Sequence, residues 1–273
     1  MPNFVETAAQ IAREASAIIE DLRRQRIGFE LKGEADLVTA ADRASELHIT
    51  TRLRKEFPTH AIVAEEGNNT ESDSGYRWYV DPLDGTTNFA HGFPIYNTTL
   101  ALEKDGVLIA GVVFDGTRNE LFSAEKSSGA YLNGERINVS KANRLEDALF
   151  STGFPSRRRH QNINIHFYYQ LAMISHGVRR TGSAAIDLAY VASGRVEGFW
   201  EFGLNPWDMA AGKLILEEAG GTVTDMHGAP HTLRSQTILA TNTHIHQPTV
   251  ALFEEIFSER SPFAIPQINL YKR

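Results

Sequence analysis

The segment from residue 97 to residue 139 limits the fold of this chain more than any other part of its sequence. Turn-forming residues recur in it between short apolar runs, as Lys104-Asp105-Gly106, Asp115-Gly116 and Asn133-Gly134. Turns at such short intervals are typical of strands that pair with their neighbours in sequence. The segment therefore predicts a meander of antiparallel strands.

Two helices are predicted before this meander. From Phe4 to Leu22 apolar residues recur at steps of three and four, as on one face of an amphipathic helix. The second helix is expected to start at Thr39, because Thr39-Ala40-Ala41-Asp42 resembles a capping box with aspartate in place of glutamate. It should run to about Phe57, which precedes a proline.

Short apolar runs at 61–64 and 77–80 predict two strands between the second helix and the meander. The second strand is expected to stop at Asp81-Pro82, because proline has a fixed φ angle and no amide donor.

After residue 140, strand-like and helix-like segments alternate. Strands are predicted near 148–151, 178–181, 196–202, 222–225 and 237–241, and helices near 160–175, 184–193, 208–219 and Pro248. The chain is therefore expected to divide into an N-terminal part, 1–140, with a helix pair and an antiparallel sheet, and a C-terminal α/β part, 141–273.

The composition excludes several classes of protein. A length of 273 residues suits one large domain or two small ones. The chain has no cysteine, so disulfides, iron–sulfur clusters and cysteine nucleophiles are excluded. No apolar run approaches the ~18 residues of a membrane span, and the first residues lack a signal-peptide pattern, so a cytoplasmic location without membrane partners is expected.

The charge balance argues against nucleic acid as the default partner. The chain carries 27 basic and 34 acidic residues, a net charge of −7, whereas proteins that bind the phosphate backbone are usually basic. One basic run, Arg157-Arg158-Arg159-His160, can be a solvated helix start or a contact for a second phosphate or a nucleic acid. Nucleic-acid binding is therefore not expected but is not excluded.

Acidic residues follow two apolar strands and precede a helix. Glu65-Glu66-Gly67 and Asp81-Pro82-Leu83-Asp84-Gly85 follow the strands, and Asp208 lies at a predicted helix start. Each has a plain structural explanation: a solvated loop, a turn and a helix cap, respectively. Together, however, they predict a site for Mg²⁺ or Mn²⁺, because hard oxygen ligands suit these ions and Mg²⁺ usually takes substrate phosphate oxygens as well.

Three motifs resemble the signatures of the inositol monophosphatase family. They are Ala64-Glu65-Glu66-Gly67, the nine-residue Asp81-Pro82-Leu83-Asp84-Gly85-Thr86-Thr87-Asn88-Phe89, and Trp207-Asp208-Met209-Ala210-Ala211-Gly212. The segments 36–42 and 180–185 and Glu201-Phe202-Gly203 also match, so that the resemblance covers about residues 4–255 and is nearest to bacterial inositol-1-monophosphatases. It implies a layered αβαβα sandwich of the sugar-phosphatase type, shared with fructose-1,6-bisphosphatase, with the metal site between a larger N-terminal and a smaller C-terminal sheet.

The resemblance also implies a role for particular residues. Two or three Mg²⁺ ions would be held by Glu65, Asp81, the carbonyl of Leu83, Asp84 and Asp208. Thr86 and Glu65 would orient the attacking water, and Asp42 would lie near the water that assists the leaving group. The substrate would contact Asp84, Gly85, Thr86, Gly182, Ser183, Ala184, Glu201 and Asp208. A homodimer and inhibition by Li⁺ are implied as well.

The motifs leave the substrate open. Inositol-1-monophosphatase, which releases myo-inositol and phosphate, is the first hypothesis, and fructose-1,6-bisphosphatase, 3′-phosphoadenosine 5′-phosphatase and histidinol phosphatase are its rivals. Glu201 favours a monophosphate with a hydroxyl-rich ring, because its carboxylate accepts hydrogen bonds and repels a second phosphate. A regulatory protein that contacts RNA or the transcription machinery is the alternative of another class.

Overall fold

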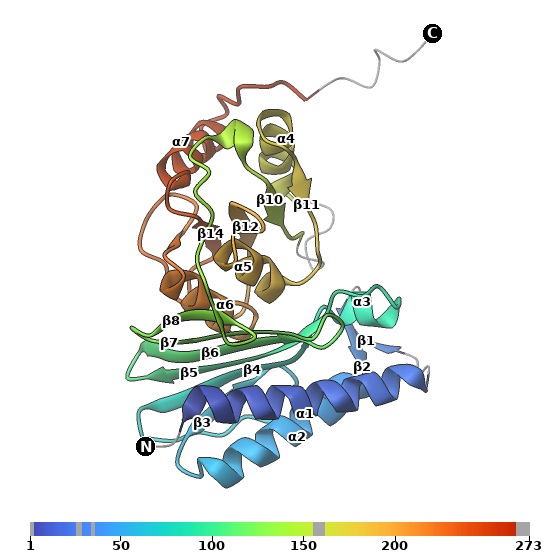
Figure 1. The fold of residues 1–273 in the computed structure, drawn as a ribbon. Coiled ribbons are helices and arrows are strands. Elements are labelled where there is room, and N and C mark those ends of the chain that lie inside the picture. The colour runs from blue at the N-terminus through green and yellow to red at the C-terminus, as the bar shows by residue number, and fades with distance from the viewer. Residues whose placement is uncertain (1–2, 26–28, 34–35, 155–161, 266–273) are drawn as a thin grey trace.

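A computed structural model describes residues 3–25, 29–33, 36–154 and 162–265 of the chain. Its elements form five layers, in the order helices, sheet, helices, sheet, helices (Figure 1). The layered αβαβα sandwich that the sequence predicts is confirmed. Helices α1 (Phe4–Arg24) and α2 (Ala40–Glu56) form the first layer, beside a small hairpin of β1 (Phe29–Gly33) and β2 (Asp36–Thr39).

The larger sheet has seven strands in the order β3-β4-β5-β6-β7-β8-β9. Every neighbouring pair is antiparallel except β3 and β4, so the predicted meander is confirmed. The turn residues Asp105, Gly106, Asn133 and Gly134 all have positive φ, as tight hairpins require. The strands are β3 (Ala61–Ala64), β4 (Tyr76–Asp84), β5 (Asn97–Lys104), β6 (Val107–Asp115), β7 (Glu120–Glu125), β8 (Gly129–Leu132) and β9 (Glu135–Ile137).

Strand β4 does not end at Pro82, and the prediction that it would is wrong. The strand continues to Asp84, but its pairing with β5 shifts register between Asp81 and Asp84. Pairing with β3 has already stopped at Val80. Pro82 therefore lies where the strand pairing is irregular, so its lack of an amide hydrogen costs no hydrogen bond between strands.

The middle layer consists of α5 (Ala184–Ala192) and α6 (Pro206–Glu218), between the two sheets. Apolar residues from both sheets and both helices form one core there, and Figure 1 shows α6 lying on the larger sheet. Gly212 of α6 is required by this packing, because a Cβ atom at that position would lie 2.6 Å from the Cβ of Leu188 in α5.

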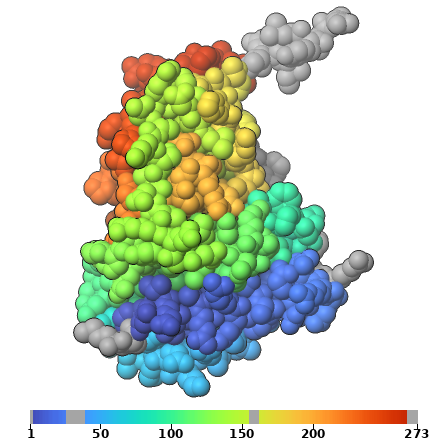
Figure 2. Space-filling view, viewed as in Figure 1, coloured from blue at the N-terminus to red at the C-terminus, as the bar shows by residue number. Residues whose placement is uncertain are grey.

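The smaller sheet has five strands in the order β11-β10-β12-β14-β13, with α4 (Asn164–Ile174) and α7 (His246–Phe257) on its outer face. Its strands are β10 (Phe150–Thr152), β11 (Val178–Arg179), β12 (Gly198–Phe202), β13 (Thr222–Thr224) and β14 (Thr237–Thr241), and a short 3-10 helix, η1 (Leu145–Asp147), precedes them. Figure 2 shows the meander as a band between the two N-terminal helices and the C-terminal layers. None of the described helices is both long and apolar enough to span a membrane.

The helix signals in the sequence act as expected. Thr39 Oγ1 accepts a hydrogen bond from the amide of Asp42 at 3.4 Å, and Asp42 Oδ2 accepts one from the amide of Thr39 at 2.7 Å. This reciprocal pair is the predicted capping box. Helix α6 begins at Pro206 rather than at Asp208, because Asn205 is its cap and proline is well suited to the first helical position.

Candidate active site

Four carboxylates lie close together at the ends of β3 and β4 and in the first turn of α6. Asp81 is only 2% exposed. Burial raises the pKa of Asp81 well above its usual value, and the nearby charges of Glu65, Asp84 and Asp208 raise it further. The predicted metal ligands therefore come from distant parts of the sequence to one place, where their negative charges repel one another.

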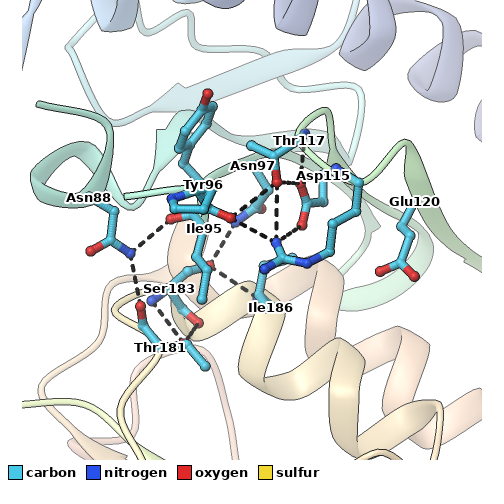
Figure 3. Close-up of polar contacts among 12 residues, drawn as sticks. Asn88, Ile95, Tyr96, Asn97, Asp115, Thr117, Glu120, Thr181, Ser183 and Ile186 are labelled. Atoms are coloured by element: carbon cyan, nitrogen blue, oxygen red, sulfur yellow. Dashed lines mark hydrogen bonds and ion pairs between the residues drawn. The ribbon is translucent and has the colours of Figure 1, made fainter. Parts of the chain in front are cut away.

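The carboxylate of Asp84 rests against the first turn of α5, from the opposite half of the chain. Its Oδ2 accepts hydrogen bonds from Ser183 Oγ at 2.6 Å and from the amide of Ala185 at 3.0 Å. Asn97 Nδ2 donates to Ser183 Oγ at 2.7 Å (Figure 3). Burial raises the pKa of Asp84 although these hydrogen bonds favour its charged form. Ser183, which also caps α5, thus joins a predicted metal ligand to a predicted substrate segment.

The hydroxyl of Thr86 is held by two acceptors. Its Oγ1 donates to Asp42 Oδ1 at 2.9 Å and lies 3.0 Å from the carbonyl oxygen of Leu83. Burial raises the pKa of Asp42, while hydrogen bonds from Thr39 and Thr86 oppose that rise. Thr86 does not cap the short helix α3 (Thr86–Ala90), because Gly85 occupies the cap position and no side chain bonds there.

Gly85 gives the turn after β4 its shape. Its φ of 92° lies in the left-handed region, and a Cβ atom there would lie 2.8 Å from the carbonyl oxygen of Ile95. Two residues beyond Thr86, Asn88 Nδ2 donates to the carbonyl oxygens of Ile95 and Thr181, each at 2.8 Å. Figure 3 shows Asn88 reaching from the α3 segment to the loop that precedes α5. The predicted phosphate-binding turn and the predicted ring-binding loop are therefore tied together.

Asp208 takes part in a capping box as well as lying near Asp81. Its Oδ2 accepts a hydrogen bond from the amide of Asn205 at 2.7 Å. The helix-capping role that the sequence offered as the alternative for Asp208 is therefore present in part: Asn205 is the cap residue, and Asp208 is its capping-box partner in the first turn.

Glu201 of β12 is buried among other acids. Burial raises its pKa well above the usual value, and Asp187, Asp208 and Asp84 raise it further, whereas Arg180 opposes them. A Cβ atom at residue 153 would lie 2.1 Å from Glu201 Oε1, so the glycine there makes room for this carboxylate. Glu201 thus lies beside the candidate metal ligands, where its role toward a substrate was predicted.

Several residues of the site were not foreseen from the sequence. The buried Asp187, Asn97, Ser45 and Glu46 all lie close to predicted site residues. A signal for three of them exists: Ser45 and Glu46 follow Asp42 at helical spacing on α2, and Asn97 begins a polar run at the head of a buried strand. Asp187 lies in an otherwise apolar helix, and its Oδ1 has no hydrogen-bond partner among the residues that the structure describes.

The loop that carries Glu65 is fastened to α2 by Glu46. Oε2 of Glu46 accepts a hydrogen bond from the amide of Glu66 at 2.6 Å. Its Oε1 accepts hydrogen bonds from the amide and the side chain of Asn68, at 3.0 and 2.8 Å. The position of Glu65 therefore depends on a buried carboxylate in another element.

The donor set suits Mg²⁺ better than any softer metal. Within the described parts of the chain, no three carboxylate or imidazole side chains enclose a metal position as they stand. Asp84 and Asp208 each direct an oxygen to a protein donor. The pKa values of Asp81 and Asp84 are nevertheless raised, and a hard divalent cation would remove the repulsion among the neighbouring carboxylates. The residues present therefore fit Mg²⁺.

Known proteins resemble this chain over most of its length. The sequence pattern of the Inositol monophosphatase family matches residues 1–258. An inositol-1-monophosphatase of Mesorhizobium japonicum is 40% identical over 260 residues, which are 94% of this chain and 97% of that protein. The Nus factor SuhB of Pseudomonas aeruginosa is 44% identical over 251 residues, 89% of this chain and 93% of that one. The crystal structure of the extragenic suppressor protein SuhB from Bartonella henselae has a TM-score of 0.88 and 41% identity, and covers 92% of this chain and 98% of its own.

Proposed function

This chain belongs to the inositol monophosphatase family, a family of phosphatases, and from that premise we propose that it is a Mg²⁺-dependent hydrolase of inositol 1-phosphate. The observation that carries the proposal is the group of neighbouring carboxylates of Glu65, Asp84 and Asp208 around the buried Asp81. When bound there, two or three Mg²⁺ ions supply positive charge that neutralises the phosphate and stabilises the leaving alkoxide. Mn²⁺ has the same ligand preferences.

Thr86 and Glu65 orient the attacking water in this proposal. The Thr86 hydroxyl is fixed by Asp42 and by the carbonyl of Leu83, so its oxygen can accept a hydrogen bond from water in one direction. Water then attacks phosphorus directly, since the chain has no cysteine and no recognised phosphoenzyme motif. Asp42 would also lie near the water that protonates the leaving group.

The inositol ring would lie between the two halves of the chain. Gly182, Ser183 and Ala184, at the start of α5, and Glu201 of β12 would face it, while the amides of Gly85 and Thr86 would receive the phosphate. The support is that Asp84 already contacts Ser183 and that Glu201 lies beside Asp84 and Asp208. A carboxylate at this place suits neighbouring ring hydroxyls better than a second phosphate.

The proposal is tested by comparing kcat/KM for phosphate release at fixed Mg²⁺. Inositol 1-phosphate should be the best substrate, ahead of fructose 1,6-bisphosphate, 3′-phosphoadenosine 5′-phosphate and histidinol phosphate. The Asp208→Asn variant should lose turnover of all four while it remains folded. A preference for one of the three rivals would reject inositol 1-phosphate as the substrate and keep the reaction class. If none of the four compounds released phosphate in a Mg²⁺-dependent way, both the substrate and the reaction class would be rejected.

The other expectations from the sequence stay predictions. They are the homodimer, the cytoplasmic location, inhibition by Li⁺ and the role at RNA or at the transcription machinery. The local support for the last of these, the basic run 157–160, lies outside the described residues. Similarity to a protein called a Nus factor favours it as a role added to the phosphatase activity.

A further inference from the structure

A cavity of about 730 Å³ lies along α6 and is not lined by any of the four candidate metal ligands. Its wall is formed by residues of β4, β5 and β6, by the turn after β7, by α6 and by the loop 231–234. We call it the α6 cavity. Its volume is within the usual range of about 300–1,000 Å³ for small-molecule sites. Leu214, Leu233 and the 41% exposed Val107 give it apolar surface.

The acidic residues of the α6 cavity are already bound by protein groups. Three glutamates line it, and each is matched by an ion pair or by backbone amides. The pairs are Glu103 with Arg77 at 3.5 Å, Glu217 with Lys213, and Glu218 with the amides of Ser127 and Gly129 at 2.7 and 2.8 Å. These acids therefore add little negative charge that an incoming anion would meet.

Two basic residues of the cavity form no ion pair within the described ranges. Lys126 and Arg234 line it, and neither forms an ion pair with any residue in the described ranges. They come from the turn after β7 and from the loop before β14, which the fold brings to one opening. With the other charges matched in pairs or by amides, these two cations favour an anion.

His231 has no hydrogen-bond partner in the described part of the chain. Its side chain lines the cavity and is 8% exposed, and both ring nitrogens lack a partner among those residues. Burial and the nearby Lys213 lower the pKa of His231 to about 4, so that at neutral pH the ring offers one donor and one acceptor. Buried polar groups are normally paired, and an exception needs an explanation. Rotation of the ring toward the cavity would let a bound molecule supply the missing partner.

We propose that the α6 cavity is a second binding site, for an organic phosphate. Lys126 and Arg234 hold its phosphate, which carries close to two negative charges at neutral pH. The ring or chain of the ligand packs on Leu214 and Leu233, and one of its polar groups pairs with His231. The site differs from the candidate active site in its lining, which includes none of the four candidate metal ligands. Lys126 and Arg234, the proposed phosphate contacts, lie in the turn after β7 and in the loop before β14.

The proposal is tested by titrating the full chain in EDTA, so that no turnover is needed. Binding is measured by calorimetry with glucose 6-phosphate and adenosine 5′-phosphate as probes. Glucose, adenosine, citrate and inorganic phosphate are titrated for comparison. At least one phosphate ester should bind with one-to-one stoichiometry, and its uncharged parent should not. The Lys126→Ala/Arg234→Ala variant should bind at least about tenfold more weakly, whereas Lys55→Ala, an exposed cation on α2, should bind like wild type.

Two histidines provide a second measurement. His246 is also buried, but its nitrogens lie 2.9 Å from Thr241 Oγ1 and 3.0 Å from Thr224 Oγ1. His231→Leu should raise the melting temperature of the free protein, by about 2–4 °C, and should weaken binding of the phosphate ester. His246→Leu should lower the melting temperature and leave binding unchanged.

Three results would overturn this proposal: no binding of either ester, equal binding by the Lys126→Ala/Arg234→Ala variant, or a lower melting temperature for His231→Leu with unchanged binding. Equal affinity for inorganic phosphate and the esters would mean an adventitious ion only. Citrate that bound as tightly as the esters would reject the choice of phosphate. Because the experiment needs no catalysis, its failure leaves the proposed phosphatase activity intact.

Discussion

Thr86 shows how one hydroxyl can be given a direction by its surroundings. Its single proton is donated to Asp42 Oδ1, with the carbonyl oxygen of Leu83 also within 3.0 Å, so its lone pairs remain for a water molecule. We expect Thr86→Ala to lower kcat by about 100-fold or more with little change in KM, because water positioning acts mainly in the transition state. Steady-state kinetics at saturating Mg²⁺ would measure both constants.

The control for this prediction is Thr86→Ser, which keeps the hydroxyl and should recover most of the rate. Loss of the buried hydrogen bonds in Thr86→Ala should lower the free energy of unfolding by only about 1 kcal/mol. A Thr86→Ala enzyme that is destabilised to that extent but retains its kcat would show that the hydroxyl serves the fold alone.

Individual residues also show how far the sequence could lead. The capping pair Thr39 and Asp42 could be recognised because these residue types are typical of a helix start, and the acids because they follow strands or precede a helix. The role of Thr86 was implied by the motif that resembles the family's. The donors to Asp84 could not, because the Ala185 amide has no side-chain signal and lies about a hundred residues further along the chain. Contacts of that kind depend on how the two halves pack, which local patterns do not encode.

At the scale of elements, α2 is a helix that buries polar side chains. Asp42, Ser45, Glu46 and Thr50 lie at helical spacing and are all fully buried. Ser45 Oγ donates to the carbonyl oxygen of Pro82 at 3.1 Å, and Glu46 binds the loop after β3. The start of α2 was predictable from its capping box, but its buried face was not, since hydrophobic periodicity identifies only apolar faces.

This buried polar face can be tested at Glu46. Glu46→Ala leaves the amides of Glu66 and Asn68 without their acceptor, so the free energy of unfolding should fall by about 2–3 kcal/mol. The apparent affinity for Mg²⁺ should also fall, because the loop at Glu66 would no longer be held and the proposed ligand Glu65 precedes it directly. Denaturant unfolding in EDTA and activity as a function of Mg²⁺ concentration would measure the two effects.

The matched control is Glu56→Ala on the same helix, which removes an ion pair to Arg52 at 3.6 Å from a side chain that is 41% exposed. A solvent-exposed pair of this kind contributes at most about 0.5 kcal/mol, and no change in Mg²⁺ dependence is expected. If Glu46→Ala resembled Glu56→Ala in both measurements, α2 would not position the loop.

At the scale of the whole molecule, acidic residues from near the middle of both halves meet around the buried Asp81. The elements were predictable because the meander, the helix pair and the later alternation each have a local signal, whereas their layered arrangement was implied by the resemblance to the family. The electrostatic cost of bringing these acids together was not predictable. Burial and neighbouring acids raise the pKa values of Asp81, Asp187 and Glu201. The free protein therefore folds against electrostatic repulsion that a bound cation would relieve.

The Asp81→Asn variant should separate the repulsion in the metal-free protein from the stabilisation by a bound cation. The folded pKa of Asp81 lies above the unfolded value of about 3.9, so its ionisation destabilises the free protein at neutral pH and ceases to do so once the pH falls through the raised pKa. In EDTA the variant should melt at a higher temperature than wild type near pH 8, and the difference should shrink toward pH 5. The asparagine can still accept the hydrogen bond from the Leu83 amide, which measures 3.0 Å in wild type.

Addition of Mg²⁺ should reverse this difference, so that wild type melts at a higher temperature than Asp81→Asn. A ligand that binds only the folded state adds about 2.7 kcal/mol at one hundred times its dissociation constant, and wild type should gain such an amount. The variant, which lacks one of the proposed metal ligands, should gain little and should have no turnover. Melting curves at pH 5, 6.5 and 8, with EDTA or Mg²⁺, would measure all of this. A variant that Mg²⁺ stabilised as strongly as wild type would place the cation away from Asp81 and would remove the basis of the proposed hydrolysis.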